Sequence, residues 1–253
     1  MSDADPSRAD RARLAAIAGH LRFFLELGLD GINPDPWWRA TLARPRGEAA
    51  RRPAERLAEL RADIGDCTRC KLHALGRRQI VFGTGNPEAE LMFVGEAPGA
   101  EEDARGRPFV GPAGQFLEEL LRSIGMTRDQ VYICNVIKCR PPNNRDPLPE
   151  EIEACRPYLD RQIEVVRPRV IATLGRYSMA RYLPNASISQ VHGRPRRIGD
   201  VIVLPLFHPA AALHQPRYKA AIEQDFLKIP ELLREAAPEE DRSQAGAEQL
   251  SLF

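Results

Sequence analysis

The fold of this chain is decided by one stretch, Leu91-Met-Phe-Val-Gly-Glu-Ala-Pro-Gly-Ala-Glu-Glu-Asp103. Its first four residues are apolar and predict a buried strand. The glycines and the proline that follow end the strand, and acidic side chains crowd the turn. A second Gly- and Pro-rich segment, Gly106 to Pro112, leads into an amphipathic helix predicted over 113–124. We therefore predict a strand, a long rigid loop and a helix, with the loop at the edge of a sheet where α/β proteins bind ligands.

The loop between this strand and this helix has the composition of a binding site. Several carboxylates beside glycines let backbone N–H groups and acids converge on one small ligand. A solvated acidic turn is the alternative, but a plain turn needs neither two Gly/Pro clusters nor an embedded Phe109. We therefore expect the loop to bind a ligand.

Further apolar runs alternate with helical patterns along most of the chain. Strands are predicted at 79–82, 131–136, 170–174 and 201–206, and helices at 54–64, 149–166, 177–182 and 218–236. Strands that alternate with helices imply a mostly parallel sheet with helices on both faces. The pattern therefore predicts an α/β fold.

Three regions of the chain differ in composition. Residues 1–55 carry a helical pattern over 11–29 and then an Arg-, Ala- and Pro-rich stretch, which we interpret as a helical extension and a linker. Residues 56–236 hold the α/β pattern. Residues 237–253 are rich in Pro, Glu, Asp, Ser, Gln and Gly, a composition that predicts a disordered tail.

The charge and hydropathy of the chain exclude some classes of protein. The 36 Lys and Arg residues nearly balance the 35 Asp and Glu residues, so any basic surface must be local. No apolar run reaches the roughly 18 residues of a membrane span. The N-terminus lacks the basic and apolar segments of a secretory signal. We expect a cytoplasmic monomer with no membrane partner.

The cysteines suggest a metal site. Cys67 and Cys70 form a C-x2-C pair, and Cys139 and Cys155 lie 16 positions apart. In a reducing compartment such thiols are metal ligands or buried thiols more often than disulfides. Four thiolates suit either a tetrahedral zinc or a [4Fe–4S] cluster, and ligand softness alone does not choose between them. Cys134 falls inside a predicted strand, where we expect an ordinary core thiol.

Polar side chains stand at the ends of three predicted strands. Glu96 follows the first strand of the opening stretch, Asn135 ends the strand at 131–136, and His208 follows the strand at 201–206. The carboxyl ends of parallel strands meet at one edge of a sheet, so these residues are expected to share a pocket. An Asn amide suits the edge of a pyrimidine, Phe109 could stack on a planar base, and His208 could donate to an oxygen that gains negative charge.

With these residues in view, the sequence resembles the family 4 uracil-DNA glycosylases, the iron–sulfur enzymes of the uracil-DNA glycosylase superfamily. The resemblance runs from about residue 64 to residue 229. The motifs that carry it are Cys67-x-x-Cys70-Lys-Leu, Phe82-Gly-x-Gly-Asn-Pro87, Gly95-Glu-Ala-Pro-Gly99, Gly106-Arg-Pro-Phe-Val-Gly111, Asn135-Val-Ile-Lys-Cys-Arg-Pro-Pro142 and Phe207-His-Pro-Ala210.

The resemblance implies a fold, a cofactor and an activity. The implied fold is a three-layer α/β/α sandwich with a central, mostly parallel four-stranded sheet. The implied cofactor is a [4Fe–4S] cluster on Cys67, Cys70, Cys139 and Cys155. The implied activity is that of a monofunctional uracil-DNA glycosylase, which flips uracil out of DNA and hydrolyses its N-glycosidic bond to start base excision repair.

The resemblance also implies roles for single residues. Phe109 would stack on the flipped uracil, Asn135 would read its O4/N3 edge, and His208 would hydrogen-bond O2 as the bond breaks. Ala97, counted here among the uracil-binding residues, stands where the best-known branch of the superfamily has an Asp that positions water. Glu96 and Glu102 are therefore the candidate catalytic carboxylates.

Other residues are candidates for contacts with DNA. Arg140, Arg145 and the cluster at 194–197 could bind phosphates, although exposed Arg often forms only a solvated surface. Leu213 could act as a wedge that fills the gap left by the flipped base. A related branch forms a covalent adduct with abasic DNA through a basic, His-bearing insertion, which this sequence lacks, so we expect turnover.

The chain ends in Gln249-Leu-Ser-Leu-Phe253, which looks like the pentapeptide that binds the bacterial sliding clamp. Such a peptide puts Leu252 and Phe253 into an apolar pocket while Gln249 hydrogen-bonds at its rim, and Leu250 is counted among the clamp-binding residues. A flexible linker would then hold the enzyme near DNA at high effective concentration.

Two other interpretations remain open from the sequence. One is a non-catalytic iron–sulfur DNA-binding module that accompanies a clamp-bound polymerase, and the other is an α/β hydrolase of small nucleotides. The presence of Glu96, Phe109, Asn135 and His208 favours the glycosylase over the first. A hydrolase of small nucleotides would not need the clamp-like tail.

Overall fold

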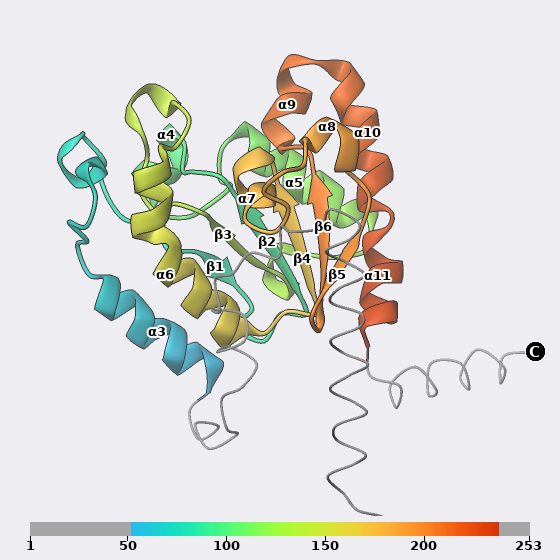
Figure 1. The fold of residues 1–253 in the computed structure, drawn as a ribbon, viewed down its shortest axis with the longest axis horizontal. Coiled ribbons are helices and arrows are strands. Elements are labelled where there is room, and N and C mark those ends of the chain that lie inside the picture. Colours follow the sequence, from blue (N-terminus) through green and yellow to red (C-terminus); the bar gives the residue numbers. More distant parts are fainter. Residues whose placement is uncertain (1–51, 238–253) are drawn as a thin grey trace, which may run out of the picture. The chain divides into compact units, whose positions relative to one another are not determined.

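The computed structural model describes residues 52–237, which form an α/β sandwich around a six-stranded sheet (Figure 1). The strand order is β1-β3-β2-β4-β6-β5. The strands are β1 (Thr84–Gly85), β2 (Leu91–Gly95), β3 (Tyr132–Asn135), β4 (Val170–Leu174), β5 (Arg196–Ile198) and β6 (Val201–Leu206). The four central strands β3, β2, β4 and β6 are parallel, and β1 and β5 pair antiparallel at the two edges.

The predicted fold class is confirmed, but the predicted number of four strands is wrong. The four expected strands are the buried parallel ones, and β1 and β5 extend the sheet to six. Neither edge strand carries a strong sequence signal, because β1 has only two residues and every residue of β5 is exposed. Charged, exposed residues are typical of a sheet edge that must not pair with another chain.

Helices cover both faces of the sheet. They are α3 (Pro53–Ile64), α4 (Ala100–Arg105), α5 (Pro112–Ser123), α6 (Pro149–Val166), α7 (Arg176–Ala180), α8 (Ile188–Val191), α9 (Pro209–His214), α10 (Pro216–Phe226) and α11 (Ile229–Ala236). The side chains of β2 alternate between two cores: Met92 and Val94 pack with α3 and α6, whereas Leu91 and Phe93 pack with α5, α10 and α11. In Figure 1, α3 and α6 accordingly lie on one side of the sheet and α10 and α11 on the other.

Three predicted elements differ in the structure. Gln79–Phe82 is not a strand; Val81 N–H instead donates to the Lys138 carbonyl at 2.8 Å, a single bond rather than a ladder. The predicted long loop contains α4, whose capping box pairs the Glu102 side chain with the Gly99 backbone. The predicted helix over 218–236 is two helices, because Pro230 has no N–H and stands in the first turn of α11.

The register of the sheet brings distant residues to one edge. Gly95 at the end of β2 pairs with Asn135 at the end of β3, and Leu174 pairs with Leu206 on the other side. Val136 N–H and Ile137 N–H then donate to the carbonyls of Gly95 and Glu96, which continues the pairing beyond the strands. The segments that follow these strands therefore surround one place.

Within residues 52–237, no helix is long and apolar enough to cross a membrane. The predicted helical extension (1–55) falls almost wholly outside the described residues, and so does the predicted tail with Gln249–Phe253.

Candidate active site

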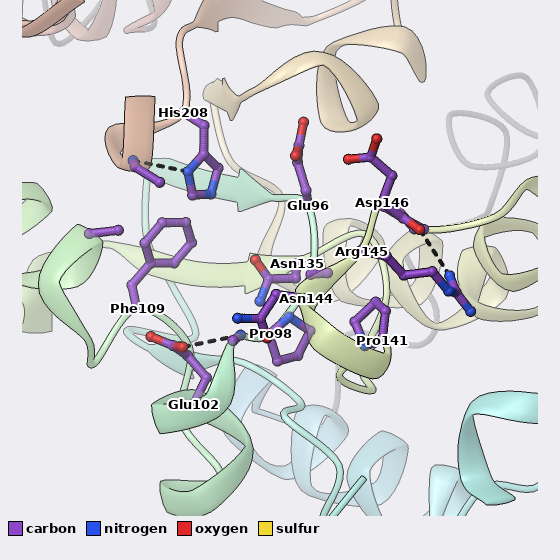
Figure 2. Close-up of a pocket in the computed structure, with 15 residues that line it drawn as sticks. Glu96, Pro98, Glu102, Phe109, Asn135, Pro141, Asn144, Arg145, Asp146 and His208 are labelled. Carbon is purple, nitrogen blue, oxygen red and sulfur yellow. Dashed lines mark hydrogen bonds between the residues drawn. The ribbon is translucent and has the colours of Figure 1, made fainter. Parts of the chain in front are cut away.

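A cavity of about 290 Å³ lies at the carboxyl edge of the sheet (Figure 2). It is lined by Glu96, Ala97, Pro98, Gly99, Glu102, Phe109, Ala113, Asn135, Pro141, Asn144, Arg145, Asp146, Pro147, His208 and Ala210. Its walls thus come from the segments after β2, β3 and β6. All the residues that the sequence analysis assigned to catalysis or to uracil binding line this cavity.

Phe109 has a backbone conformation that is rare for its residue type. Its φ is 52°, in the left-handed region, which costs a non-glycine residue roughly 1–2 kcal/mol. The side chain is 5% exposed, and its ring stacks beside the His208 ring with centroids 5.5 Å apart and planes 26° apart. The surrounding chain must therefore hold the Phe109 backbone in place.

Glu102 supplies part of that restraint. Its Oε1 accepts hydrogen bonds from Val110 N–H at 2.8 Å and Gly111 N–H at 2.9 Å, and its Oε2 accepts from Gly99 N–H at 3.1 Å. Both oxygens are thus used to hold the main chain. Figure 2 shows Glu102 next to the Phe109 segment, on the opposite side of the cavity from Glu96.

Gly95 lets the side chains of Asn135 and Phe109 converge. A Cβ atom at Gly95 would lie 2.3 Å from Asn135 Oδ1 and 2.6 Å from Phe109 Cε2, closer than real Cβ contacts. Only a glycine therefore lets these two side chains approach the end of β2.

Asn135 presents an unsatisfied acceptor to the cavity. The residue is 1% exposed, and its Oδ1 is buried without a hydrogen-bond partner among the described residues. An unpaired buried polar atom costs roughly 1–3 kcal/mol, so this oxygen is poised for a donor on a ligand. The buried Lys138 fixes the Asn135 backbone, since its Nζ donates to the Asn135 carbonyl at 2.7 Å and to Gln162 Oε1 at 2.5 Å.

His208 is held as a neutral hydrogen-bond donor. Its Nδ1 accepts a hydrogen bond from Ala210 N–H at 3.1 Å, so Nδ1 carries no proton and the proton of the neutral ring is on Nε2. Burial lowers the pKa of His208 to about 4. The ring is therefore neutral at physiological pH.

One carboxylate oxygen of Glu96 accepts a backbone hydrogen bond, and the pKa of this residue is shifted. Its Oε1 accepts from Tyr177 N–H at 3.0 Å in the first turn of α7. Burial raises the pKa of Glu96 above its ordinary value, against the Tyr177 backbone bond and the Arg176 charge, which lower it. Gly175 makes room for this carboxylate, because a Cβ there would lie 2.4 Å from Glu96 Oε1.

The Pro-rich segment after β3 forms a wall that the sequence analysis did not assign to the pocket. Asn144, Asp146 and two prolines line the cavity from this segment. Arg140 Nε donates to Asn144 Oδ1 at 2.7 Å, which orients the Asn144 amide. Arg145 forms a bidentate pair with the buried Glu151 at 2.8 and 2.6 Å, so its guanidinium braces this wall.

Four cysteines gather away from this cavity. Cys139 and Cys155 are buried in the core beside α3 and α6, and Cys67 and Cys70 pack against the same core. Burial raises the pKa of Cys139 to about 11, with contributions from the nearby Cys155 and Cys70. Burial likewise raises the pKa of Cys155, with contributions from Cys70 and Cys67. The fifth cysteine, Cys134, is buried in β3.

Hydrogen-bond donors lie beside several of these thiols. Three of them accept hydrogen bonds: Cys67 from Arg69 N–H at 3.5 Å, Cys139 from Arg77 Nη1 at 3.1 Å, and Cys155 from the Lys138 backbone. Such donors favour thiolates. Within residues 52–237, no three His, Cys, Asp or Glu side chains converge on a point that could hold one metal ion.

Two residues proposed to contact DNA do not line the cavity. Leu213 is 50% exposed on α9, five positions after His208. Arg140 is partly buried beside Asn144. Of the cluster at 194–197, Arg197 pairs with Glu235 at 3.0 Å.

The fold and the cavity define a class of protein. An α/β sandwich with an aromatic ring, an unsatisfied amide and a neutral imidazole at one sheet edge suits an enzyme that binds a planar heterocycle. Residues 82–229 match the model of the Uracil DNA glycosylase superfamily.

Curated relatives narrow the assignment. The chain is 48% identical to a type-4 uracil-DNA glycosylase of Sulfurisphaera tokodaii, over 70% of this chain and 84% of that one. It is 46% identical to one of Archaeoglobus fulgidus, over 73% and 96%, and 48% identical to one of Thermotoga maritima, over 63% and 84%. This chain therefore belongs to the uracil-DNA glycosylase superfamily and, within it, to the type-4 enzymes. The resemblance inferred from the sequence motifs is confirmed.

The depressed pKa of His208 predicts a pH-dependent stability. Between about pH 4 and 6.5 the unfolded state binds a proton at this site that the folded state does not, so His208 makes stability rise with pH in that window. Replacing His208→Gln removes this slope. When the pH is lowered from about 7.5 to about 5, the free energy of unfolding in urea should fall by about 2 kcal/mol more for wild type than for the variant. An unchanged difference at the two pH values would contradict a depressed pKa.

Proposed function

We propose that this chain excises uracil from DNA with the cavity at the carboxyl edge of its sheet. As a member of the type-4 family it is a monofunctional DNA glycosylase that hydrolyses the N-glycosidic bond and so starts base excision repair. The observation that carries the use of this cavity is the buried, unpaired Asn135 Oδ1 beside the Phe109 ring. The two together suit a flat ring with an N–H on its edge.

Asn135 and Phe109 recognise the base. Uracil presents an N3–H donor next to an O4 acceptor, and the Asn135 amide offers the complementary acceptor and donor. Cytosine presents an acceptor and a donor at the same places, which would leave the buried Asn135 atoms unpaired. Phe109 stacks on the face of the ring, a contact worth roughly 1–3 kcal/mol per base.

His208 stabilises the leaving group. When the bond between N1 and C1′ breaks, its electron pair leaves with the uracil ring, and negative charge grows on O2. The Nε2–H of neutral His208 donates a hydrogen bond to this oxygen. No proton needs to be transferred, because the Ala210 N–H holds the tautomer that already presents the donor.

Glu96, rather than Glu102, is the carboxylate that acts on the sugar and on the attacking water. The Glu102 oxygens bind three backbone N–H groups, whereas Glu96 is tied by its Oε1 to the first turn of α7. Glu96 orients the water that adds to C1′, takes the proton that this water releases, and offsets the positive charge of the oxocarbenium-like sugar. Ala97, beside it in the cavity wall, leaves space for the base.

The base must leave the duplex to reach the cavity. Extrusion costs a few kcal/mol and is easiest for a weakly paired uracil opposite guanine. The half-exposed Leu213 on α9 is suited to fill the vacated space. Arg140 and Arg145 act mainly on the protein, by bracing the wall of the cavity, and contact phosphates only at their exposed edges.

Single-turnover excision tests these roles. Duplexes with one U·G or one U·A pair should yield alkali-labile abasic sites with wild type, faster from U·G. Asn135→Ala and His208→Ala should slow excision roughly 100-fold or more, since each removes a bond strengthened in the transition state. Leu227→Ala, which changes a 61% exposed side chain that does not line the cavity, is the control and should match wild type. Binding without excision by wild type would instead indicate a non-catalytic DNA-binding module.

We also propose that Cys67, Cys70, Cys139 and Cys155 hold a [4Fe–4S] cluster. A cluster binds each thiolate to a different iron, so its ligands stand farther apart than those around one zinc. The packing of all four cysteines on one core and the N–H donors at three of them support the cluster. The cluster would tie the segment before β1 to the start of α6, a structural role.

Iron analysis tests the cluster. The protein purified without air should contain about four iron and four sulfide ions per chain. Cys70→Ala should lose most of the iron and unfold more easily, whereas Cys134→Ala, a buried thiol outside the group, should keep it. Stoichiometric zinc in place of iron would overturn the assignment.

We propose further that Gln249–Phe253 binds the sliding clamp. These residues lie outside the described part of the chain, and the proposal rests on their sequence alone. Deleting residues 249–253 should abolish capture by immobilised clamp and leave excision from oligonucleotides unchanged. Ser251→Ala, which keeps Gln249, Leu250, Leu252 and Phe253, should still be captured. Capture of the truncated chain by the immobilised clamp would contradict this proposal.

A further inference from the structure

We propose that Arg128 is a positioning residue for base recognition, because it holds the main chain of Phe109 in the conformation that presents the ring to the base. The proposal deepens the proposed function and rests on it, since the proposed function gives Phe109 its stacking role. Arg128 itself does not line the cavity. It acts through Phe109 from the side away from the base.

Arg128 binds two successive carbonyls of the Phe109 segment. It begins the 3-10 turn Arg128–Gln130, between α5 and β3. Its Nη1 donates to the Phe109 carbonyl at 2.7 Å, and its Nη2 donates to the Pro108 carbonyl. The planar guanidinium fork suits this bidentate arrangement in a way that a flexible ammonium does not. The two carbonyls are thereby fixed relative to each other.

Glu102 holds the same segment from its other side. Its carboxylate accepts from the N–H groups of Val110 and Gly111, so four consecutive residues, 108–111, are bound between one cation and one anion. Phe109 lies at the centre, with its φ of 52°. Without these restraints a non-glycine residue relaxes towards negative φ, which would turn the ring away.

The burial of Arg128 indicates that its guanidinium has a role beyond packing. Its side chain is 13% exposed, and its Nε is buried with no partner in the described structure. Burial lowers the pKa of Arg128, and Glu118 is its nearest carboxylate at 3.4 Å. Burying a guanidinium in this way is costly. Water could satisfy the two carbonyls, but it could not hold them in a fixed geometry.

A double-mutant cycle tests whether Arg128 acts through Phe109. Single-turnover excision from U·G duplexes should slow about 10- to 100-fold in Phe109→Ala, which loses the stack, and comparably in Arg128→Met. Adding Arg128→Met to Phe109→Ala should then change the rate less than about twofold. A loss in the double variant equal to the product of the two single losses would overturn the proposal.

Two further variants separate positioning from stability. Gly114→Ala keeps Arg128 but places a Cβ 1.9 Å from the Phe109 carbonyl oxygen, so it should slow excision and also fail to add to Phe109→Ala. Arg122→Met on α5, which removes an exposed arginine bonded to the Glu118 carbonyl, should match wild type. If Arg128→Met does not fold, the same double-mutant cycle is measured with Arg128→Lys.

Different results would contradict the stacking role of Phe109 and the positioning role of Arg128. Normal excision by Phe109→Ala would remove the stacking role from the proposed function, and the role of Arg128 with it. A slow Phe109→Ala beside a normal, folded Arg128→Met would refute the role of Arg128 alone. Loss of excision in both single variants, together with additivity in the double variant, would assign Arg128 to general stability.

Discussion

The active site depends on the absence of a side chain at Gly95. The parallel register places the end of β2 against the end of β3, and the Gly95 carbonyl accepts from Val136 N–H at 2.9 Å. This hydrogen bond fixes the end of β2 next to Glu96, which lines the cavity. Because Gly95 has no Cβ, the Asn135 amide and the Phe109 ring both approach the end of β2 more closely than any other residue would allow. Two side chains that line the cavity are thus brought together at the end of one strand.

The same enclosure shifts the pKa values of two residues that line the cavity. Burial disfavours charge, so it lowers the pKa of His208 and raises that of Glu96. In the proposed reaction a neutral imidazole is the more useful donor, because it stabilises a developing anion without first having to gain a proton. The backbone N–H of Tyr177 and the nearby Arg176 favour the charged form of Glu96 and so oppose the effect of burial on its pKa.

The sequence predicts those parts of the structure whose signal is local or strongly apolar. β4, β6 and α6 have the predicted limits, because their runs are buried and bounded by proline or glycine. β5 was missed because its residues are exposed, and α4 because its acidic first turn resembles a loop. The resemblance implies Glu96 and Glu102 as candidate catalytic carboxylates, but the hydrogen bonds of Glu102 to three backbone N–H groups leave no trace in the sequence. The contact of Arg128 with Phe109 spans 19 positions, and no local pattern reports it.

The short helix α9 joins two tasks in one rigid piece. His208 is its N-cap and receives the N–H of Ala210, which fixes the tautomer, and Leu213 stands exposed one turn further on. Under the proposed function, His208 contacts the leaving base and Leu213 fills the space that the base leaves in the duplex. Because both residues belong to one short helix, a shift of α9 would change the positions of both groups together.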